Sequence, residues 1–332
     1  MKEMKNEGLI TLVDEYKSLT AERDHEVDSW YINLNTEVDG SKIGFTWHQS
    51  TMAIGKEMNS SVEICMMDLT RDIWFAKADC LPVDHQTFTS EKELNVQSIY
   101  GGLKGNEKKM HLNVAVDDDR VDLILTPGDT TLFNSGAGFF KLFNTSDCWE
   151  YAWPNMCANG TITLAGKTYE IKNASAWFDR QINDQMSIKD FTSKEFRAPS
   201  WTWIGFNPAG VSTGVGAFSL WDNYLNGKRY TYATVVMENG GQLYTPATVT
   251  YSDVWTSSQT KNIYPKKFHI SIPVVNIELD YQVMVENQEF IQPAAAALSG
   301  SQAPFSVKGI ANGKKVDSFM IVEMIGGIQL DD

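Results

Sequence analysis

The sequence predicts an all-β protein built from two consecutive antiparallel barrels. Most of the chain alternates apolar and polar residues at the period of a β-strand. Helical periodicity is confined to two short segments, and two strand patterns each occur twice in the same order. The length of 332 residues is sufficient for two domains with separate cores. Barrels are favoured because closing a sheet removes its exposed edges and leaves a ligand-sized interior.

The individual elements follow from local patterns. Helical spacing occurs around residues 9–19 and, weakly, around residues 182–192. Residues 30–37 and 42–49 are predicted to pair as a hairpin, because the intervening Asp39-Gly40 favours a tight turn. Other predicted strands comprise residues 111–116, 121–125, 231–237, 269–272, 278–285 and 319–324.

A second hairpin is predicted at residues 159–181. Apolar and polar residues alternate on both sides of a turn at residues 165–167. If the second strand continues through AWFDRQ at residues 176–181, then Asp179 shares one face with Trp177 and Gln181, and Arg180 lies on the other face. A carboxyl group beside an indole on a face expected to point into a barrel is costly unless it is paired or used.

Two repeated patterns divide the chain. SWYI at residues 29–32 is echoed by SWTWI at residues 200–204, and the hairpin before Asp179 is echoed at residues 307–323. We therefore predict an N-terminal barrel in residues 1–190, with a short helical N-terminal extension, and a C-terminal barrel in residues 191–332. Trp30 and Trp201 are expected at equivalent positions.

Composition limits the partners. The net charge of −14 argues against nucleic acid or an anionic membrane surface, since both require a basic face. No segment approaches the apolar length of a membrane span, and the N-terminus lacks the apolar core of a signal peptide, so a cytoplasmic protein is expected. The cysteines have no C-x-x-C spacing and no close histidine pair occurs, so no metal site is predicted. No G-x-G-x-x-G follows a strand and opens a helix, so no cofactor is predicted either.

Several segments resemble a known superfamily. They are SWYINLNTEVDGSKIGF, AWFDRQ, WTWIGF, VWTSSQTKNIYPKKFHISIP and VEMIGG, in this order between about Trp30 and Gly326. Together they resemble the lipocalin-like superfamily that includes hydroxyneurosporene synthase (the carotenoid hydratase), kievitone hydratase and decalin-forming Diels–Alderases. The resemblance implies two tandem lipocalin-like (calycin) barrels. It also implies water addition to an isolated alkene or cyclisation of a bound polyene, without an organic redox cofactor, but it does not fix the reaction.

Asp179 is the main candidate for acid–base chemistry. Protonating an unactivated C=C bond requires a strong proton donor, and a carboxylic acid supplies one only if it stays protonated near neutral pH, which burial favours by raising its pKa. Trp177 on the same face could stabilise the resulting cation through its π face. The alternative is that Asp179 forms a structural ion pair with Arg180 or caps a strand end.

Other candidate site residues surround Asp179 in this interpretation. Tyr151 could donate or relay a proton, and His48 ends a strand of the first barrel. Aromatic residues at strand spacing suggest a flat apolar or phenolic ligand, although such stripes are more often simple core. The predicted cavity lies in the first barrel or at the junction, and its candidate substrate-binding residues are Trp47, Trp149, Trp153, Trp177, Gln181, Trp201 and Trp203.

The leading functional hypothesis is a cofactor-independent lyase or isomerase that transfers a proton at a C=C bond of a hydrophobic isoprenoid or phenolic molecule. Addition of water would make it a hydratase, and addition of a hydroxyl from the same molecule a cyclising isomerase. The alternatives are a pericyclase that folds a polyene and a non-catalytic lipocalin-type carrier. The sequence does not specify the substrate, its stereochemistry or the oligomeric state.

Overall fold

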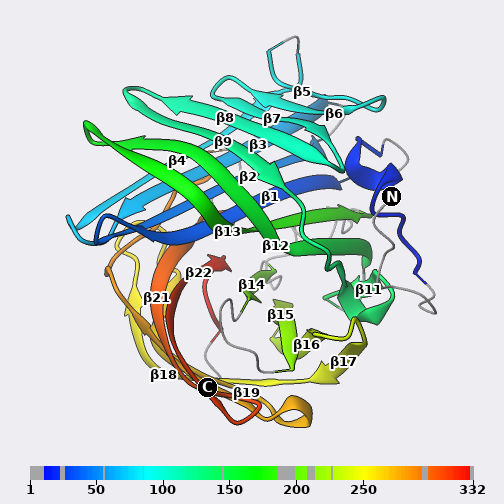
Figure 1. Ribbon diagram of the computed structural model, residues 1–332, viewed down its shortest axis with the longest axis vertical. Helices are drawn as coiled ribbons and strands as arrows, with labels where there is room; N and C mark the ends of the chain where they lie inside the picture. Colours follow the sequence, from blue (N-terminus) through cyan, green and yellow to red (C-terminus); the bar gives the residue numbers. More distant parts are fainter. Residues whose placement is uncertain are drawn as a thin grey trace.

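The computed structural model describes residues 11–22, 27–54, 57–84, 86–143, 146–184, 199–207, 214–225, 227–293 and 298–329. Two curled antiparallel sheets contain most of these residues (Figure 1). The predicted all-β fold of two tandem barrel-like units is therefore confirmed. Among the described residues, no helix combines the length and the apolar character that a membrane crossing requires.

The N-terminal sheet has 13 strands in the order β4-β3-β2-β1-β13-β12-β9-β8-β7-β6-β5, with β10 and β11 also paired to β12. A 3-10 helix, η1 (Lys17–Leu19), precedes it, and η2 (Asn134–Gly136) separates β10 from β11. The strands are β1 (Val27–Val38), β2 (Ser41–Ile54), β3 (Glu57–Asp68), β4 (Ile73–Pro82), β5 (Phe88–Thr89), β6 (Leu94–Ser98), β7 (Gly101–Asn106), β8 (Lys109–Val116), β9 (Asp119–Thr126), β10 (Leu132–Phe133), β11 (Phe139–Leu142), β12 (Ser146–Leu164) and β13 (Lys167–Asn183).

The C-terminal sheet has nine strands in the order β17-β16-β15-β14-β22-β21-β20-β19-β18. It curls into a nearly complete ring in the view of Figure 1. The short helix η4 (Pro273–Val275) links β19 to β20. The strands are β14 (Ser200–Phe206), β15 (Val215–Leu225), β16 (Lys228–Met237), β17 (Gln242–Pro246), β18 (Thr248–Thr256), β19 (Ile263–Ile272), β20 (Ile277–Val283), β21 (Gly300–Ala311) and β22 (Lys314–Ile325).

Both sheets share one connectivity. In each, the first strand lies between the second and the last: β1 between β2 and β13, and β14 between β15 and β22. Each last strand arrives through a hairpin with a two-residue turn at positive φ, Ala165-Gly166 (48° and 75°) in the first sheet and Asn312-Gly313 (46° and 81°) in the second. The repeat seen in the sequence thus corresponds to two units of the same topology.

The predicted equivalence of Trp30 and Trp201 is wrong. Trp30 points into the apolar core enclosed by the N-terminal sheet, whereas Trp201 packs against clusters between the two sheets. The neighbouring residues show the reason: Ile32 and Ile204 are the interior residues of β1 and β14, so the two segments match only after a shift of one position. In a strand such a shift exchanges the faces.

The predicted helices are largely replaced by other structure or lie outside the described residues. Near the start, only the three residues of η1 are helical between residues 11 and 22. At the second segment, Ile182 and Asn183 end β13 as strand residues, and the remainder lies outside the described ranges. The predicted boundary between residues 190 and 191 also lies outside them.

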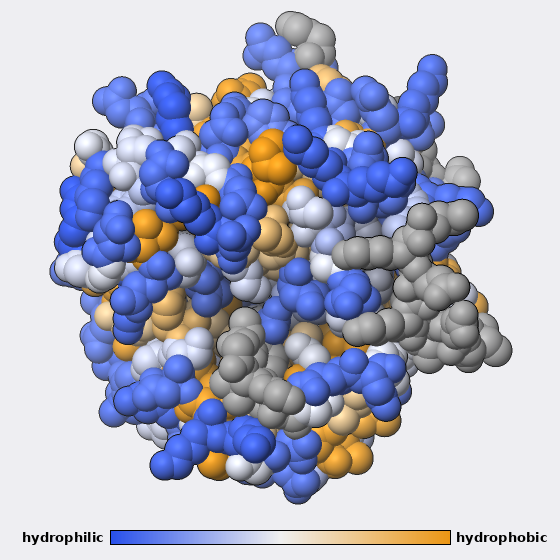
Figure 2. Space-filling view, in the orientation of Figure 1, coloured by the Kyte–Doolittle hydropathy of each residue, from blue (hydrophilic) through white to orange (hydrophobic). Residues whose placement is uncertain are grey.

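The two sheets contact each other through their outer faces. Separate apolar cores fill the interior of each sheet, and two further clusters combine residues from both halves, among them Tyr31 with Trp203 and Cys65 with Ile321. Figure 2 shows that the outside of the molecule seen in this view is largely hydrophilic, with apolar residues in scattered patches. The junction is therefore the place where the outward sides of both sheets become buried.

Gly160 in β12 provides a test of this sheet geometry. Its φ is +145°, and a Cβ atom there would lie 2.0 Å from the Asp122 carbonyl oxygen of β9. We expect Gly160→Ala to lower the free energy of unfolding by about 2–4 kcal/mol through strain and overlap. Gly166→Ala, at φ +75° with nothing within 4 Å, should cost only about 1–2 kcal/mol. Urea unfolding followed by tryptophan fluorescence compares them, and equal losses would contradict the described β9–β12 contact.

Candidate functional site

A row of side chains crosses the outer face of the N-terminal sheet. The strand register places Asp179 of β13 opposite Tyr31 of β1, Tyr31 opposite His48 of β2, and His48 opposite Glu63 of β3. Residues directly opposite in antiparallel strands lie on the same face. Glu150 of β12 belongs to this face as well, because it lies opposite Gln181.

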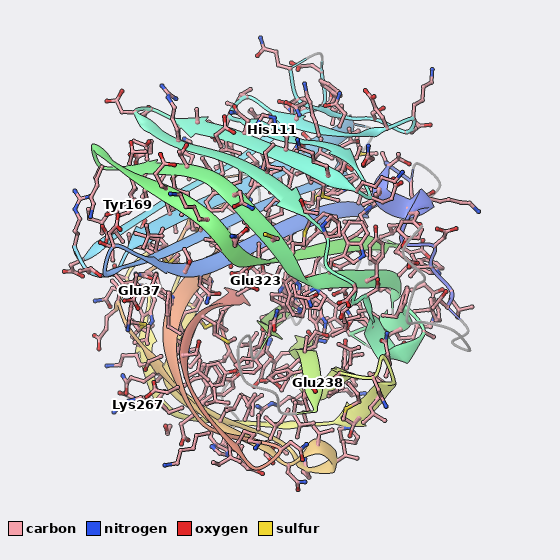
Figure 3. The ribbon with its side chains drawn as sticks, in the orientation of Figure 1. Glu37, His111, Tyr169, Glu238, Lys267 and Glu323 are labelled. Carbon is pink, nitrogen blue, oxygen red and sulfur yellow. The ribbon has the colours of Figure 1, made fainter. Side chains whose placement is uncertain are left out.

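A second row crosses the outer face of the C-terminal sheet. Gln302 of β21 lies opposite Glu323 of β22, Glu323 opposite Trp203 of β14, and Trp203 opposite Trp221 of β15. The two rows meet, because the Tyr31 hydroxyl donates a hydrogen bond of 3.2 Å to Gln302 Oε1. Figure 3 shows Glu323 between the two sheets. The site is thus built from both halves of the chain.

Two adjoining cavities lie along these rows. The larger has a volume of about 210 Å³, with Val27, Met52, Phe143 and Trp201 among its apolar lining residues. The smaller, of about 20 Å³, is lined by residues that include Glu150, Asp179 and Trp203, and has room for about one water molecule. Both cavities are lined by Ser29, His48, Gln181, Trp221 and Glu323.

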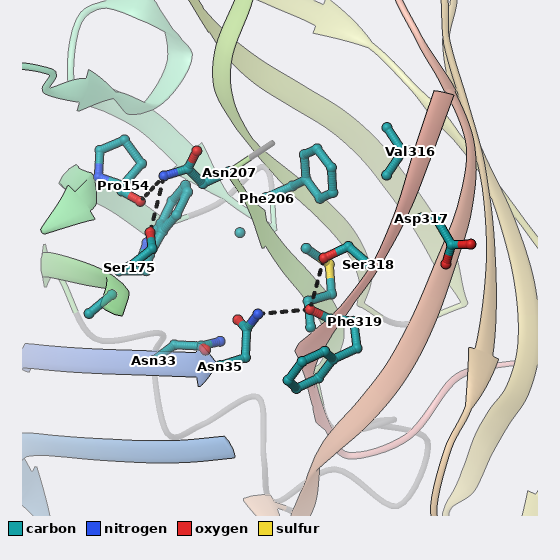
Figure 4. Close-up of a pocket in the computed structure, with 14 residues that line it drawn as sticks. Asn33, Asn35, Pro154, Ser175, Phe206, Asn207, Val316, Asp317, Ser318 and Phe319 are labelled. Atoms are coloured by element: carbon teal, nitrogen blue, oxygen red, sulfur yellow. Dashed lines mark hydrogen bonds between the residues drawn. The ribbon is translucent and has the colours of Figure 1, made fainter. Parts of the chain in front are cut away.

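A third cavity of about 260 Å³ also lies at the junction (Figure 4). Ser175 and Trp177 of β13 line it, together with Asn35 and Asn207. Both asparagine amides are already bonded, Asn35 Nδ2 to the Phe319 carbonyl oxygen and Asn207 Nδ2 to that of Pro154, each at 2.8 Å. The buried acidic groups are absent from its lining, so we place the candidate active site in the other two cavities.

Asp179 is buried without a hydrogen-bonding partner for Oδ1 among the described residues. The residue is 8% exposed. Burial raises the pKa of Asp179 well above its ordinary value of 3.8; the nearby Trp177 indole opposes this rise and the charge of Glu323 adds to it. The net effect favours the protonated acid. Asp179 lies on the outer face of its sheet rather than on the barrel interior that the sequence suggested.

Arg180 lies on the opposite face and is bound elsewhere. Its Nη2 lies 2.5 Å from Asp28 Oδ1, and its Nε donates a hydrogen bond of 2.6 Å to the Ser18 carbonyl oxygen. The guanidinium also stacks over the Trp30 ring at 4.2 Å. The ion pair that the sequence allowed between Asp179 and Arg180 is therefore formed by Arg180 and Asp28.

Three further carboxyl groups share the junction with Asp179. Burial, together with the charge of Asp179, raises the pKa of Glu150 well above its ordinary value. Burial also raises the pKa of Glu63 to about 7. Burial would raise the pKa of Glu323 too, but its contacts with His48, Trp201 and Gln302 lower it below the ordinary value. The site thus contains one ionised carboxyl group, that of Glu323, beside carboxyl groups whose raised pKa values favour the protonated form.

His48 is the only basic side chain among the described residues lining the two adjoining cavities. Burial lowers the pKa of His48, but the interaction with Glu323 and the charges of Glu63 and Asp179 outweigh burial and raise it above its ordinary value. Its Nδ1 lies 3.6 Å from Glu323 Oε2. His48 therefore belongs to the same electrostatic group as Asp179.

The structure brings together some of the predicted site residues and separates others. His48, Gln181, Trp201 and Trp203 line the adjoining cavities with Asp179, and Trp177 lies at the junction against Trp203. Four others belong to the core cluster inside the N-terminal sheet or pack against it: Trp47, Trp149, Tyr151 and Trp153.

The register explains this separation. Tyr151 lies opposite Arg180 and Trp153 opposite Phe178, whereas Ala152 lies opposite Asp179. The stripe on β12 therefore faces the side of the sheet that Asp179 does not. Among the described residues, the cavities at the junction are lined by neither Tyr151 nor Trp153, in contrast to the lining that the sequence suggested.

Sequence reasoning missed Glu63, Glu150 and Glu323. Each is a carboxyl residue with an apolar residue on either side, as in SSVEICMM at residues 60–67 and FMIVEMI at residues 319–325. Such a residue on a buried strand is a signal of the same kind as Asp179, and it could have identified all three. Their convergence could not be read from one strand at a time.

The fold places the chain in a class of proteins that are built from two tandem antiparallel barrel-like units. In this chain the two units share an acidic junction. The chain belongs to the AttH-like family, whose model matches residues 17–301. No curated protein sequence matches the chain.

Solved structures of similar fold cover nearly the whole chain. A putative AttH from Nitrosomonas europaea has a TM-score of 0.77 at 15% identity, covering 97% of this chain and 98% of its own. Kievitone hydratase from Nectria haematococca has a TM-score of 0.77 at 18% identity, with coverages of 96% and 94%. CghA with Sch210972 has a TM-score of 0.53 at 9% identity, with coverages of 98% and 96%. The resemblance to the lipocalin-like superfamily is therefore confirmed at the level of the fold.

Proposed function

We propose that this protein is a lyase or isomerase in which Asp179 donates a proton to a C=C bond of a hydrophobic small molecule. The observation that carries the proposal is the buried Asp179 carboxyl, which faces a cavity and whose Oδ1 has no hydrogen-bond partner among the described residues. This arrangement keeps a carboxylic acid protonated and close to a bound molecule. No organic cofactor takes part in the proposed proton transfer.

The aromatic residues suit the intermediate that such a transfer creates. Protonation of an alkene carbon forms a C–H bond and leaves a carbocation on the neighbouring carbon. Trp203 and Trp221 line the small cavity beside Asp179, and a ring face stabilises a nearby cation by about 0.5–2 kcal/mol. Attack by water completes a hydration, and attack by a hydroxyl of the same molecule closes a ring. The attacking oxygen loses one proton, so the net proton balance is restored when Asp179 is reprotonated.

The lining of the cavities supports a hydroxylated isoprenoid or a phenolic substrate. Apolar residues cover much of the larger cavity. The indole N–H groups of Trp203 and Trp221 have no hydrogen-bond acceptor among the described residues, so they could donate to substrate oxygens. The Glu323 carboxylate, whose contacts lower its pKa, disfavours an anionic substrate by like-charge repulsion. Sugars with many hydroxyls would leave polar groups against apolar walls.

Two other functions stay open as alternatives. A pericyclase would fold a polyene in the same cavity and would not need Asp179 as an acid. The similarity in fold to CghA makes this alternative worth testing. A carrier would bind the ligand without turnover.

Incubating isoprenoid and phenolic alkenes in deuterated water distinguishes these functions. With the wild-type protein, we expect product carrying deuterium at the protonated carbon, because Asp179 exchanges its proton with solvent. Asp179→Asn should abolish this product. Turnover without deuterium incorporation would favour the pericyclase, and binding without turnover would favour the carrier. Mass spectrometry of the products and a fluorescence titration of each alkene provide the two measurements.

A further inference from the structure

Three side chains at the junction converge on a common position. His48 comes from β2, Glu63 from β3 and Glu323 from β22, and one potential ligand atom of each lies within 4.8 Å of the other two. All three line the cavity of about 210 Å³. We propose that these three residues bind a divalent first-row transition-metal ion. Its three proposed ligands do not include the proton donor Asp179, although His48 and Glu323 line the smaller cavity with it.

The distances between the three groups fit coordination of one shared metal ion better than direct hydrogen bonds between the groups. His48 Nδ1 lies 3.6 Å from Glu323 Oε2 and 3.8 Å from Glu63 Oε2. A charge-assisted hydrogen bond would bring such atoms to about 2.7–2.9 Å. Ligand atoms that each lie about 2.0–2.2 Å from one ion are about 2.8–3.6 Å apart, with octahedral geometry at the lower end and tetrahedral geometry at the upper end. The observed distances are closer to the second range.

Two of the converging atoms form no hydrogen bond in the part of the chain that the structure describes. Glu63 Oε2 and His48 Nδ1 are both buried without a hydrogen bond among the described residues. Glu63 is 9% exposed, so water does not readily replace the missing partner. Buried polar atoms are nearly always satisfied. A cation between the imidazole and the carboxylate would satisfy both atoms.

The imidazole is oriented for coordination through Nδ1. The second ring nitrogen of His48, Nε2, lies 2.6 Å from the Ser29 hydroxyl oxygen. When Nε2 carries the hydrogen and donates to Ser29, Nδ1 presents its lone pair toward Glu63 and Glu323. Metal-binding histidines are usually fixed in this way by a hydrogen bond from the other ring nitrogen.

Both carboxylates have outer partners as well. Glu323 accepts hydrogen bonds from Gln302 Nε2 at 2.7 Å and from Trp201 Nε1 at 2.8 Å. Glu63 Oε1 accepts one from Gln292 Nε2 at 3.4 Å. These bonds orient the carboxylates while leaving Glu63 Oε2 available. Such second contacts are typical of ligand residues in metal sites.

The donor set and the local charge indicate the class of ion. One imidazole and two carboxylates suit Mn²⁺, Fe²⁺ or Zn²⁺, whereas Ca²⁺ and Mg²⁺ favour oxygen ligands alone. No Lys or Arg among the described residues lines the two adjoining cavities. A divalent ion would offset the charge that ionised Glu63 and Glu323 bring into this buried region. Coordination positions not taken by the protein would face the larger cavity.

Metal binding to the full-length protein tests the proposal. After treatment with EDTA and removal of the chelator, we expect Mn²⁺ or Zn²⁺ to bind at one ion per chain in isothermal titration calorimetry. Glu63→Gln and Glu323→Gln should each weaken binding by at least about 100-fold, since each removes a ligand. Circular dichroism checks that the variants fold. Co²⁺ provides a second readout, because its visible absorption bands report coordination geometry in the wild type and in His48→Gln.

Matched control variants distinguish ion binding at this site from ion binding at the protein surface and from the role of Asp179 as proton donor. His269 forms an exposed cluster with Glu278 and Asp280, and His269→Asn should leave the high-affinity binding unchanged. Asp179→Asn should also bind the ion, so loss of proton transfer and loss of metal are distinguishable. Wild type without stoichiometric binding, or binding that survives in both glutamate variants, would overturn the proposal. Binding lost only in His269→Asn would place the ion on the surface and would overturn it equally.

Discussion

Asp179→Asn is expected to lower the turnover rate by at least about 10²–10⁴-fold, the usual contribution of a general acid. The amide has nearly the same shape as the carboxyl group but lacks its acidic proton. Ligand affinity should change little, because cavity walls such as Trp201 and Trp221 remain in place. Steady-state kinetics and a ligand titration on the same preparation measure the two effects separately.

The pH dependence of the rate provides an independent check on Asp179. Burial raises the pKa of Asp179 above 3.8, and only the protonated form can start the reaction. The rate should therefore be highest below the raised pKa and fall as the pH rises through it. The same profile measured with and without EDTA separates this titration from any effect of a bound ion.

Tyr151→Phe is the matched control for this acid. Its hydroxyl lies inside the N-terminal sheet, opposite Arg180, so its loss should leave turnover nearly unchanged. If Tyr151→Phe abolishes turnover while Asp179→Asn does not, the acid has been assigned to the wrong face of the sheet.

Arg180→Met is expected to lower the free energy of unfolding by about 3–5 kcal/mol, the usual effect of removing one partner of a buried ion pair. Arg180 is fully buried, and the substitution leaves the Asp28 carboxylate without its cation. It also removes the bonds to the Ser18 and Thr20 carbonyl oxygens, which hold the segment before β1. Urea unfolding followed by circular dichroism measures the loss.

Two further variants show whether the loss of stability comes from the buried ion pair. Arg120 is exposed, so Arg120→Met should change stability by no more than about 0.5 kcal/mol. The double variant Arg180→Met with Asp28→Asn should regain part of the loss, because no buried charge is left unpaired. A loss for Arg180→Met as small as that for Arg120→Met would show that the Asp28 pair contributes little.

Much of the fold could be predicted because strand alternation and turn chemistry are local. Asp39-Gly40 and Ala165-Gly166 mark turns that the structure contains at those positions. The equivalence of positions in the two halves was harder to predict from the sequence. Trp30 and Trp201 follow a serine in both repeats, yet they face opposite sides of their strands, because the facing is fixed by pairing with distant strands.

The candidate site was predictable only in part, for the same reason. Asp179 stood out within one strand, as a carboxyl between aromatic residues. Glu63, Glu150 and Glu323 come from three other strands, and only the register between strands places them on one face or at one junction. The aromatic stripe of Tyr151 and Trp153 was ambiguous, since alternation shows which residues share a face but not which face meets a cavity.

The position of the last strands in the chain also determines when, during synthesis, the environment of the Asp179 carboxyl group is completed. The N-terminal sheet can complete its pairing once β13 has left the ribosome, because β1 pairs with β13. Glu323 and the rest of β22 follow roughly 7–28 s later at ordinary elongation rates. Until then, Asp179 lacks the part of its burial that the C-terminal sheet supplies, and burial is the main cause of its raised pKa. The nascent protein therefore acquires a carboxyl group that stays protonated near neutral pH only when the second sheet docks.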